Sequence, residues 1–310
     1  MFAESLIALV GILSVQAAKA SPAPMVLNEL PTARYVAVAP GGGPMRKNPD
    51  SLGAEITAKA GAVLDVTSGR FLYEKDANAA YPIASLTKLM TVMTFLDSRP
   101  DLNEEVTMIS GDDTGEGASV FLPDERLSKR ELVRCALVGS VNASAAALAR
   151  STGDRDAFVR AMNAKARALG MTHATFIEPT GLDPRNQASA KDVALALRAA
   201  LSYPDIRDYT EQDKFDLKGR ATGHVYHITT TNLLLNSFLN KSPYRIVAGK
   251  TGSLPEAGYC LAQATRNDAG KEIIAVVLGS ENHFSRFQDA KSLTWWTFQN
   301  YEWPKVALAP

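Results

Sequence analysis

Cysteine is almost absent from this chain of 310 residues, which contains only Cys135 and Cys260. The two lie far apart in apolar stretches, so the sequence has neither a disulfide framework nor the paired cysteines of a zinc site. The four histidines belong to no metal-binding or catalytic motif, and we interpret each as structural. The sequence therefore predicts two buried cysteines, no metal and no cofactor.

An excess of charge is also missing, because 33 basic residues balance 33 acidic ones. No cluster of lysine and arginine stands out, which argues against a nucleic-acid partner. Long apolar runs are scarce as well. The longest, residues 6–15, is too short to span a membrane comfortably, and we expect the mature chain to be soluble.

That apolar run lies in residues 1–20, which are typical of a signal peptide. It is followed by Ala18 and Ala20, the small residues that a signal peptidase requires. The usual positive charges are missing, because Glu4 is the only charge ahead of Ala18. We expect export to the periplasm or the cell-wall space, with a tether if the leader is not cleaved.

The remaining chain divides into a Pro/Gly/Ala-rich linker or arm at 21–57, a domain at 58–303 and a tail at 304–310. Apolar runs on either side of residues 67–69 predict a β-hairpin, and three more strands follow residue 244. Strands at both ends with helices between them indicate an α+β fold with one antiparallel sheet.

Helical signals dominate the middle of the domain, where Ser128 and Glu131 form a capping box. A last helix near the C-terminus carries Trp295 and Trp296. We expect both tryptophans to pack in the core.

Ser85 and Lys88 stand three positions apart in "YPIASLTKLM", an otherwise apolar helix pattern. Residues at this spacing are neighbours on one helix surface, and Pro82 places Ser85 in the first turn, where unpaired N–H groups favour negative charge. A lysine among apolar residues has a lowered pKa, so its neutral amine can take a proton from a serine. The alternative is a surface serine with a lysine whose amine reaches solvent.

Ser140 and Asn142 lie between two helical stretches. The hydroxyl can relay a proton and the amide can bind a substrate carbonyl. Both residue types also cap helices routinely, and Ser280 and Asn282 repeat the pattern, so position in the fold must decide.

Lys250, Thr251 and Gly252 lie in a predicted strand. A cation beside a hydroxyl can hold a carboxylate, and the glycine lets an extended substrate lie along the strand edge. A phosphate-binding loop is excluded, because Tyr244 stands where its first glycine belongs. An exposed strand lysine is the alternative.

The order Ser-x-x-Lys, Ser-x-Asn, Lys-Thr-Gly is the signature of penicillin-binding proteins and serine β-lactamases. With "SVNASAAALA" and "GKTGSLPEAGYCLA", the sequence resembles the low-molecular-mass penicillin-binding proteins of the D-alanyl-D-alanine carboxypeptidase A family, peptidase S11. The resemblance covers about residues 58–303. It implies a β-lactamase/transpeptidase-like fold, a five-stranded antiparallel sheet flanked by helices with a helical subdomain, and an active site between them.

By similarity, the chain is a serine-type D-Ala-D-Ala carboxypeptidase that hydrolyses peptidoglycan stem peptides in cell-wall biosynthesis and remodelling. β-Lactam antibiotics would acylate the same serine. The resemblance implies catalytic roles for Ser85 as nucleophile, Lys88 as base and Ser140 as proton relay. It implies substrate-binding roles for Asn142, Lys250, Thr251, Gly252 and Ser253, with the backbone N–H groups of Ser85 and Ser253 as the oxyanion hole.

Two departures leave the substrate open. Ser253 stands where some carboxypeptidases of the family have histidine. The chain also ends soon after Trp303, without the C-terminal β-domain and membrane anchor of many members. This short form is similar to the endopeptidase branch, so a DD-endopeptidase that cuts peptidoglycan cross-links is the alternative.

A serine β-lactamase and a non-catalytic penicillin-binding sensor are second alternatives. Glu178 and Pro179 match the Glu-Pro loop of class A β-lactamases, but Leu182 stands where those loops carry asparagine, so we expect Glu178 to be an ordinary loop residue. The intact motifs disfavour a sensor. A Ser-His-Asp hydrolase is disfavoured because the chain has no Gly-x-Ser-x-Gly.

Overall fold

A computed structural model describes residues 42–112 and 120–304 of the chain. Their centre is an antiparallel sheet of five strands in the order β10–β11–β12–β2–β3. The strands are Ala60–Asp65 (β2), Phe71–Lys75 (β3), Tyr244–Leu254 (β10), Gly258–Asn267 (β11) and Glu272–Ser280 (β12). The predicted sheet, drawn from both ends of the domain, and the predicted hairpin are confirmed. The predicted signal peptide lies outside the described residues.

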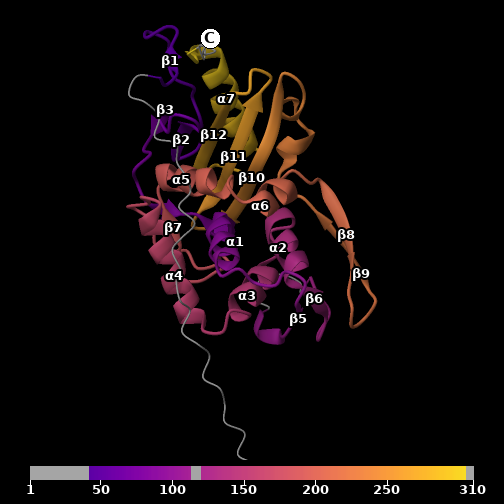
Figure 1. Cartoon of the computed structure of the whole chain (residues 1–310). Coiled ribbons are helices and arrows are strands. Elements are labelled where there is room, and N and C mark those ends of the chain that lie inside the picture. The colour runs from indigo at the N-terminus through magenta and orange to yellow at the C-terminus, as the bar shows by residue number, and fades with distance from the viewer. Residues whose placement is uncertain (1–41, 113–119, 305–310) are drawn as a thin grey trace, which may run out of the picture.

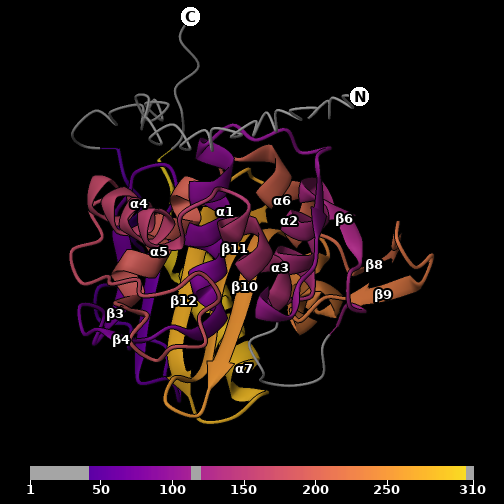
Figure 2. The same cartoon turned by 90° about the horizontal axis from the view of Figure 1, so that it is seen from below.

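Helices cover both faces of this sheet (Figure 1, Figure 2). They are the 3-10 turn Ala84–Leu86 (η1) and the α-helices Thr87–Asp97 (α1), Lys129–Val138 (α2), Asn142–Arg150 (α3), Arg155–Ala168 (α4), Ala190–Ala200 (α5), Pro204–Thr210 (α6) and Ser285–Asn300 (α7). The predicted capping box at the start of α2 is present: Glu131 N–H donates to the Ser128 side chain, and Ser128 N–H donates to the Glu131 carboxylate.

Alternation along the strands sends side chains into two apolar layers. Val63 and Val277 pack in one cluster with α7, whereas Leu64 and Val276 pack in the other with the helices of the opposite face. Because both faces are covered, every residue of β12 is buried. Cys135 and Cys260 are buried as predicted.

Four two-stranded pairs and the 3-10 turns Ser110–Asp112 (η2), Leu233–Asn236 (η3) and Phe238–Asn240 (η4) lie outside this sheet. The strand pairs are Met45–Arg46 (β1) with Tyr301–Glu302 (β13), Tyr81–Pro82 (β4) with Gln187–Ala188 (β7), Glu105–Thr107 (β5) with Arg126–Ser128 (β6), and Lys214–Lys218 (β8) with Val225–Thr229 (β9). The β8–β9 hairpin projects from the body (Figure 1, Figure 2) and was not predicted, although both strands alternate buried and exposed residues.

The prediction that Trp295 packs in the core is wrong, because its side chain is 52% exposed. The buried positions of α7 include Leu293, Thr294, Thr297 and Phe298, a helical stripe that leaves position 295 on the opposite side. Trp296 is half-buried, and its Nε1–H donates to the carbonyl of Leu52 at 3.1 Å.

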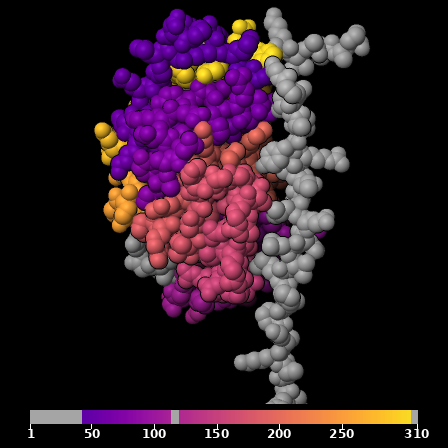
Figure 3. All heavy atoms as spheres, turned by 90° about the vertical axis from the view of Figure 1, so that its left-hand side faces the viewer, coloured from indigo at the N-terminus to yellow at the C-terminus, as the bar shows by residue number. Residues whose placement is uncertain are grey.

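The described N-terminal and C-terminal residues meet at one end of the molecule, as the indigo and yellow atoms show (Figure 3). The buried carboxylate of Asp289 joins them. It accepts hydrogen bonds from Thr57 N–H, the Thr57 hydroxyl, Ala58 N–H and the Ser280 hydroxyl, at 2.7–3.0 Å. Within the described residues, no helix is both long and apolar enough to cross a membrane.

Replacing Asp289 with alanine is expected to lower the free energy of unfolding by about 3 kcal/mol, because four donors lose a buried anionic acceptor. Urea unfolding would measure the loss. The control is Asp216→Ala, which removes an exposed carboxylate paired with His227 and should change stability by no more than about 0.5 kcal/mol. Equal losses in the two variants would contradict the role given to Asp289.

Candidate active site

Ser85 lies in η1 immediately before α1, in the first turn of the helical segment as predicted. The backbone turns sharply into it, since Ala84 has a φ of 48°. Two glycines leave room for this turn. A Cβ added to Gly181 would lie 2.1 Å from the Ala84 carbonyl oxygen, and one added to Gly252 would lie 3.0 Å from the Ser85 nitrogen. Gly252 thus lets β10 approach the serine, a role that the sequence did not predict.

Lys88 has none of its surface exposed to solvent. Its Nζ lies 2.8 Å from Ser85 Oγ, 2.7 Å from Asn142 Oδ1 and 2.6 Å from the carbonyl oxygen of Thr180. The amide oxygen and the carbonyl oxygen can only accept hydrogen bonds. A neutral amine has two hydrogens and one lone pair, so these two acceptors take both hydrogens and the lone pair faces the Ser85 hydroxyl.

The electrostatics of the site favour this neutral form. Burial lowers the pKa of Lys88 to about 7 from its ordinary 10.5, because the charged ammonium loses its hydration. The negative charge of Glu178 acts in the opposite direction and raises the pKa. A large fraction of the amine is therefore unprotonated near neutral pH.

A second buried lysine, Lys250, stands on β10 with 2% of its surface exposed. Its Nζ donates to Ser140 Oγ at 2.7 Å and to the Thr251 carbonyl at 2.9 Å. Burial lowers its pKa well below the ordinary value, and the positive charges of Lys88 and Arg286 lower it further. Neither lysine is the solvent-exposed residue of the alternative interpretation.

These groups converge on a crevice of about 370 Å³. Its lining includes Ser85, Ser140, Thr231, Thr251, Gly252 and Ser253. Asn142, at the start of α3, joins them through its bond to Lys88. All eight candidate residues thus come together from η1 and α1, the α2–α3 turn and β10, whereas the second Ser-x-Asn, at Ser280 and Asn282, lies at the end of β12.

Arg286 and His283 also line the crevice, and sequence reasoning missed both. The sequence predicted a structural role for His283, and the structure adds that this side chain lines the crevice. The Arg286 guanidinium, a donor only, donates to the Gly252 carbonyl at 3.2 Å and to His283 Nδ1 at 3.1 Å. Its Nε has no hydrogen-bond partner among the described residues. Burial lowers the pKa values of both side chains, and no local motif marks either residue.

Glu178 lies in a loop, as the sequence predicted, but it is buried there. Its buried carboxylate accepts hydrogen bonds from Thr180 N–H, the Thr180 hydroxyl, Gly181 N–H and Asn186 Nδ2, at 2.5–2.7 Å. These donors all belong to its own loop and occupy both carboxylate oxygens. The carboxylate therefore lacks the free acceptor that a water-activating base requires.

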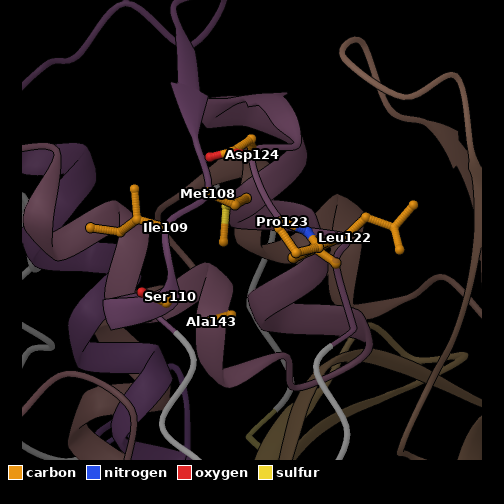
Figure 4. Close-up of a pocket in the computed structure, with 8 residues that line it drawn as sticks. Met108, Ile109, Ser110, Leu122, Pro123, Asp124 and Ala143 are labelled. Carbon is orange, nitrogen blue, oxygen red and sulfur yellow. The ribbon is translucent and has the colours of Figure 1, made fainter.

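A larger hollow, of about 600 Å³, lies beside α3. Met108, Ile109, Leu122, Pro123 and Ala143 give it an apolar lining, with Ser110 and Asp124 as its labelled polar residues (Figure 4). It contains neither lysine and neither serine of the motifs. We therefore place the candidate active site in the smaller crevice, because of the chemistry of its lining residues and not because of its volume.

A serine beside a buried lysine, with a second lysine on the adjoining strand, is the arrangement that penicillin-binding proteins and serine β-lactamases share. The family model of peptidase S11, D-alanyl-D-alanine carboxypeptidase, matches residues 45–282. The chain belongs to this family.

Relatives and solved structures agree with this assignment. The chain is 36% identical to a D-alanyl-D-alanine endopeptidase of Pseudomonas aeruginosa, over 84% of each chain, and 31% identical to one of Escherichia coli, over 82% of each. It is 27% identical to a D-alanyl-D-alanine carboxypeptidase of Bacillus subtilis, over 79% of this chain and 63% of that one.

Among solved structures, the Streptomyces K15 DD-transpeptidase is similar with a TM-score of 0.74 and 26% identity, over 80% of this chain and all of that one. Penicillin-binding protein D2 of Listeria monocytogenes in its cefotaxime-bound form has a TM-score of 0.69 and 28% identity, over 79% of this chain and 98% of that one. The β-lactamase/transpeptidase-like fold expected from the sequence is confirmed.

Replacing Gly252 with alanine is expected to slow labelling by fluorescent penicillin on the order of 100-fold. The added Cβ would lie 2.8 Å from the Ile83 carbonyl and would push the Ser85 backbone out of place. The rate of labelling and the melting temperature would be measured together. Gly53→Ala is the matched control, because its Cβ would meet Tyr73 at an ordinary 3.6 Å; equal labelling rates would refute the close-approach argument.

Proposed function

We propose that Ser85 is the nucleophile and Lys88 the general base of a D-Ala-D-Ala carboxypeptidase reaction on peptidoglycan stem peptides. The observation that carries the proposal is the arrangement at Lys88 Nζ. In the neutral amine, two obligatory acceptors take both hydrogens, and the remaining lone pair is left for Ser85 Oγ, which lies 2.8 Å from Nζ. This is the geometry that a base needs to remove a hydroxyl proton.

In the acylation step, Ser85 Oγ attacks the carbonyl carbon of the penultimate D-alanine while its proton moves to Lys88 Nζ. The backbone N–H groups of Ser85 and Ser253 stabilise the oxyanion, a contribution of about 3 kcal/mol for each donor. The C–N bond then breaks, and the leaving amine takes a proton through Ser140. Water hydrolyses the resulting ester and restores the serine.

Lys250, Thr251 and Arg286 receive the carboxylate of the substrate. In the structure the Thr251 hydroxyl contacts the Thr231 hydroxyl at 2.6 Å, and both residues line the crevice together with Arg286. Burial lowers the pKa values of the two basic groups. A bound carboxylate reverses this effect, because an opposite charge nearby favours the protonated form. Substrate binding therefore stabilises the cations that hold it.

β-Lactam antibiotics present a carboxylate and a reactive carbonyl in a similar relation, and we assign acylation by them to Ser85. Penicillin-binding protein D2, the structural relative bound to cefotaxime, supports this assignment. An enzyme acting on peptidoglycan works outside the cytoplasm, so we retain the proposal of export to the periplasm or the cell-wall space.

A DD-endopeptidase is the second candidate. The relatives from Pseudomonas aeruginosa and Escherichia coli, which match more than four fifths of both chains, carry that name. A cross-link also presents a carboxylate on a D-centre beside the scissile bond, so the same Lys250–Thr251 pocket accepts it. The two activities differ in the substituent on the leaving amine rather than in the acylation chemistry.

Digestion of purified muropeptides followed by mass spectrometry tests both activities. A carboxypeptidase is expected to remove one alanine from pentapeptide monomers, whereas an endopeptidase converts cross-linked dimers to monomers. Ser85→Ala is expected to lose more than about 1,000-fold in either activity, with its melting temperature nearly unchanged. Retention of activity by this folded variant would refute the proposed nucleophile.

The rate of acylation by penicillin is expected to rise with pH and to reach half of its plateau near pH 7, where Lys88 loses its proton. Below this pH the rate should fall tenfold per unit, because only the neutral amine can accept the serine proton. Stopped-flow measurements of the labelling rate between about pH 5 and about pH 9 would record this profile. A flat profile would contradict an amine base.

A further inference from the structure

The Glu178 carboxylate organises the loop 178–186, which packs against Ser85 and Lys88. The mechanism proposed above for Ser85 and Lys88 assigns no role to Glu178. We propose that Glu178 is a positioning residue for the base: it fixes the Thr180 carbonyl that binds Lys88 and, through its charge, sets the pH at which the base becomes active. The inference deepens the proposed function and rests on it.

The first step of the argument is the contact between the loop and the base. Thr180 contributes its carbonyl oxygen to Lys88 Nζ at 2.6 Å, and Pro179 contributes its carbonyl oxygen to the Thr91 hydroxyl at 2.6 Å, one turn along α1. Two consecutive carbonyls are therefore docked on the helix that carries the base. The Thr180 carbonyl occupies one of the two hydrogens of the neutral amine, so its placement helps to aim the lone pair at Ser85.

The second step is how the loop holds these carbonyls. The Glu178 carboxylate accepts hydrogen bonds from both the N–H and the hydroxyl of Thr180, each at 2.6 Å, and from Gly181 N–H at 2.5 Å. Asn186 closes the loop by donating to the Glu178 carboxylate at 2.7 Å and to the Glu178 carbonyl at 3.0 Å. Hydrogen bonds to a carboxylate are among the stronger ones in proteins, and this carboxylate is buried.

The third step is the contact with the serine. Gly181 has a φ of 90° and lies against the Ala84 carbonyl, where a Cβ would be only 2.1 Å away. The loop residue that follows the Thr180 carbonyl therefore packs directly on the turn that presents Ser85. One carboxylate thus fixes the positions of both partners in the proton transfer.

The last step concerns charge. Glu178 in the loop is the charged group that acts on the pKa of Lys88, and Lys88 in turn lowers the pKa of Lys250 on β10, whereas Ser85 and Asn142 are neutral. Glu178 raises the pKa of Lys88 against the larger effect of burial. It also stabilises the ammonium ion that forms when Lys88 takes the serine proton.

The test compares pH profiles of acylation by fluorescent penicillin in three variants. Glu178→Gln removes the charge and places amide hydrogens against the donors of the loop. We expect its plateau rate to fall on the order of 100-fold and its midpoint to move to lower pH. Thr180→Val removes one donor to Glu178 but leaves the charge, so its plateau should fall less and its midpoint should stay with that of the wild type.

The matched control is Asp183→Asn, in the same loop, whose partly exposed carboxylate pairs with Arg185. Its rate and midpoint should equal those of the wild type. If Glu178→Gln folds and its midpoint is unchanged, the inference is overturned. If Glu178→Gln does not fold, an unchanged plateau rate in Thr180→Val overturns it instead. A wild type that penicillin does not acylate would instead overturn the proposed function, and this inference with it.

Discussion

The structure depends on one interaction: a buried amine held against a serine hydroxyl. Burying Lys88 is unfavourable for folding. Its pKa falls to about 7, whereas an unfolded lysine titrates near 10.5. Below pH 7 both states bind the proton, and the shift corresponds to roughly 5 kcal/mol of lost stability. Between pH 7 and 10.5 the unfolded chain binds more protons than the folded one, so this penalty shrinks as pH rises.

The rest of the fold offsets this unfavourable free energy and places the buried amine beside the serine. The sheet, covered on both faces, supplies apolar burial, and β10 at its edge carries Lys250 to the crevice. The helices bring Ser85 and Lys88 to the same place from the other side. Ala84, with its positive φ, and Ser140, with a φ of 57°, sit at the points where the chain must turn sharply to do so. Strain of this kind is typical of functional sites, where the surrounding structure holds it in place.

Sequence alone indicated the parts of this arrangement that local patterns encode. Ser85 and Lys88 share one helix turn, and the motif at Lys250 lies in one strand, so their spacing could be read from the chain. The contacts of Arg286 and Glu178 could not be predicted in this way. Their contacts depend on tertiary packing: Arg286 binds a carbonyl 34 positions away, and the Glu178 loop reaches a lysine about 90 positions away. The prediction for Trp295 was wrong for a related reason, because composition alone does not tell which side of α7 faces the sheet.

The two lysines differ in what they require from a substrate. In the proposed mechanism Lys88 must stay neutral to act as a base, and the two hydrogens of its neutral amine point to Asn142 and Thr180. Lys250 has a hydroxyl and a carbonyl as its neighbours, and it gains most from an incoming anion. In the proposed function, a carboxylate bound beside Thr251 and Arg286 favours the protonated form of Lys250, whose amine contacts the crevice residue Ser140. On this proposal, the burial that lowers both pKa values makes Lys88 a base and makes the charge of Lys250 depend on a bound anion. The proposed recognition of the substrate carboxylate and the proposed activation of the serine then have the same physical cause, the burial of two lysines.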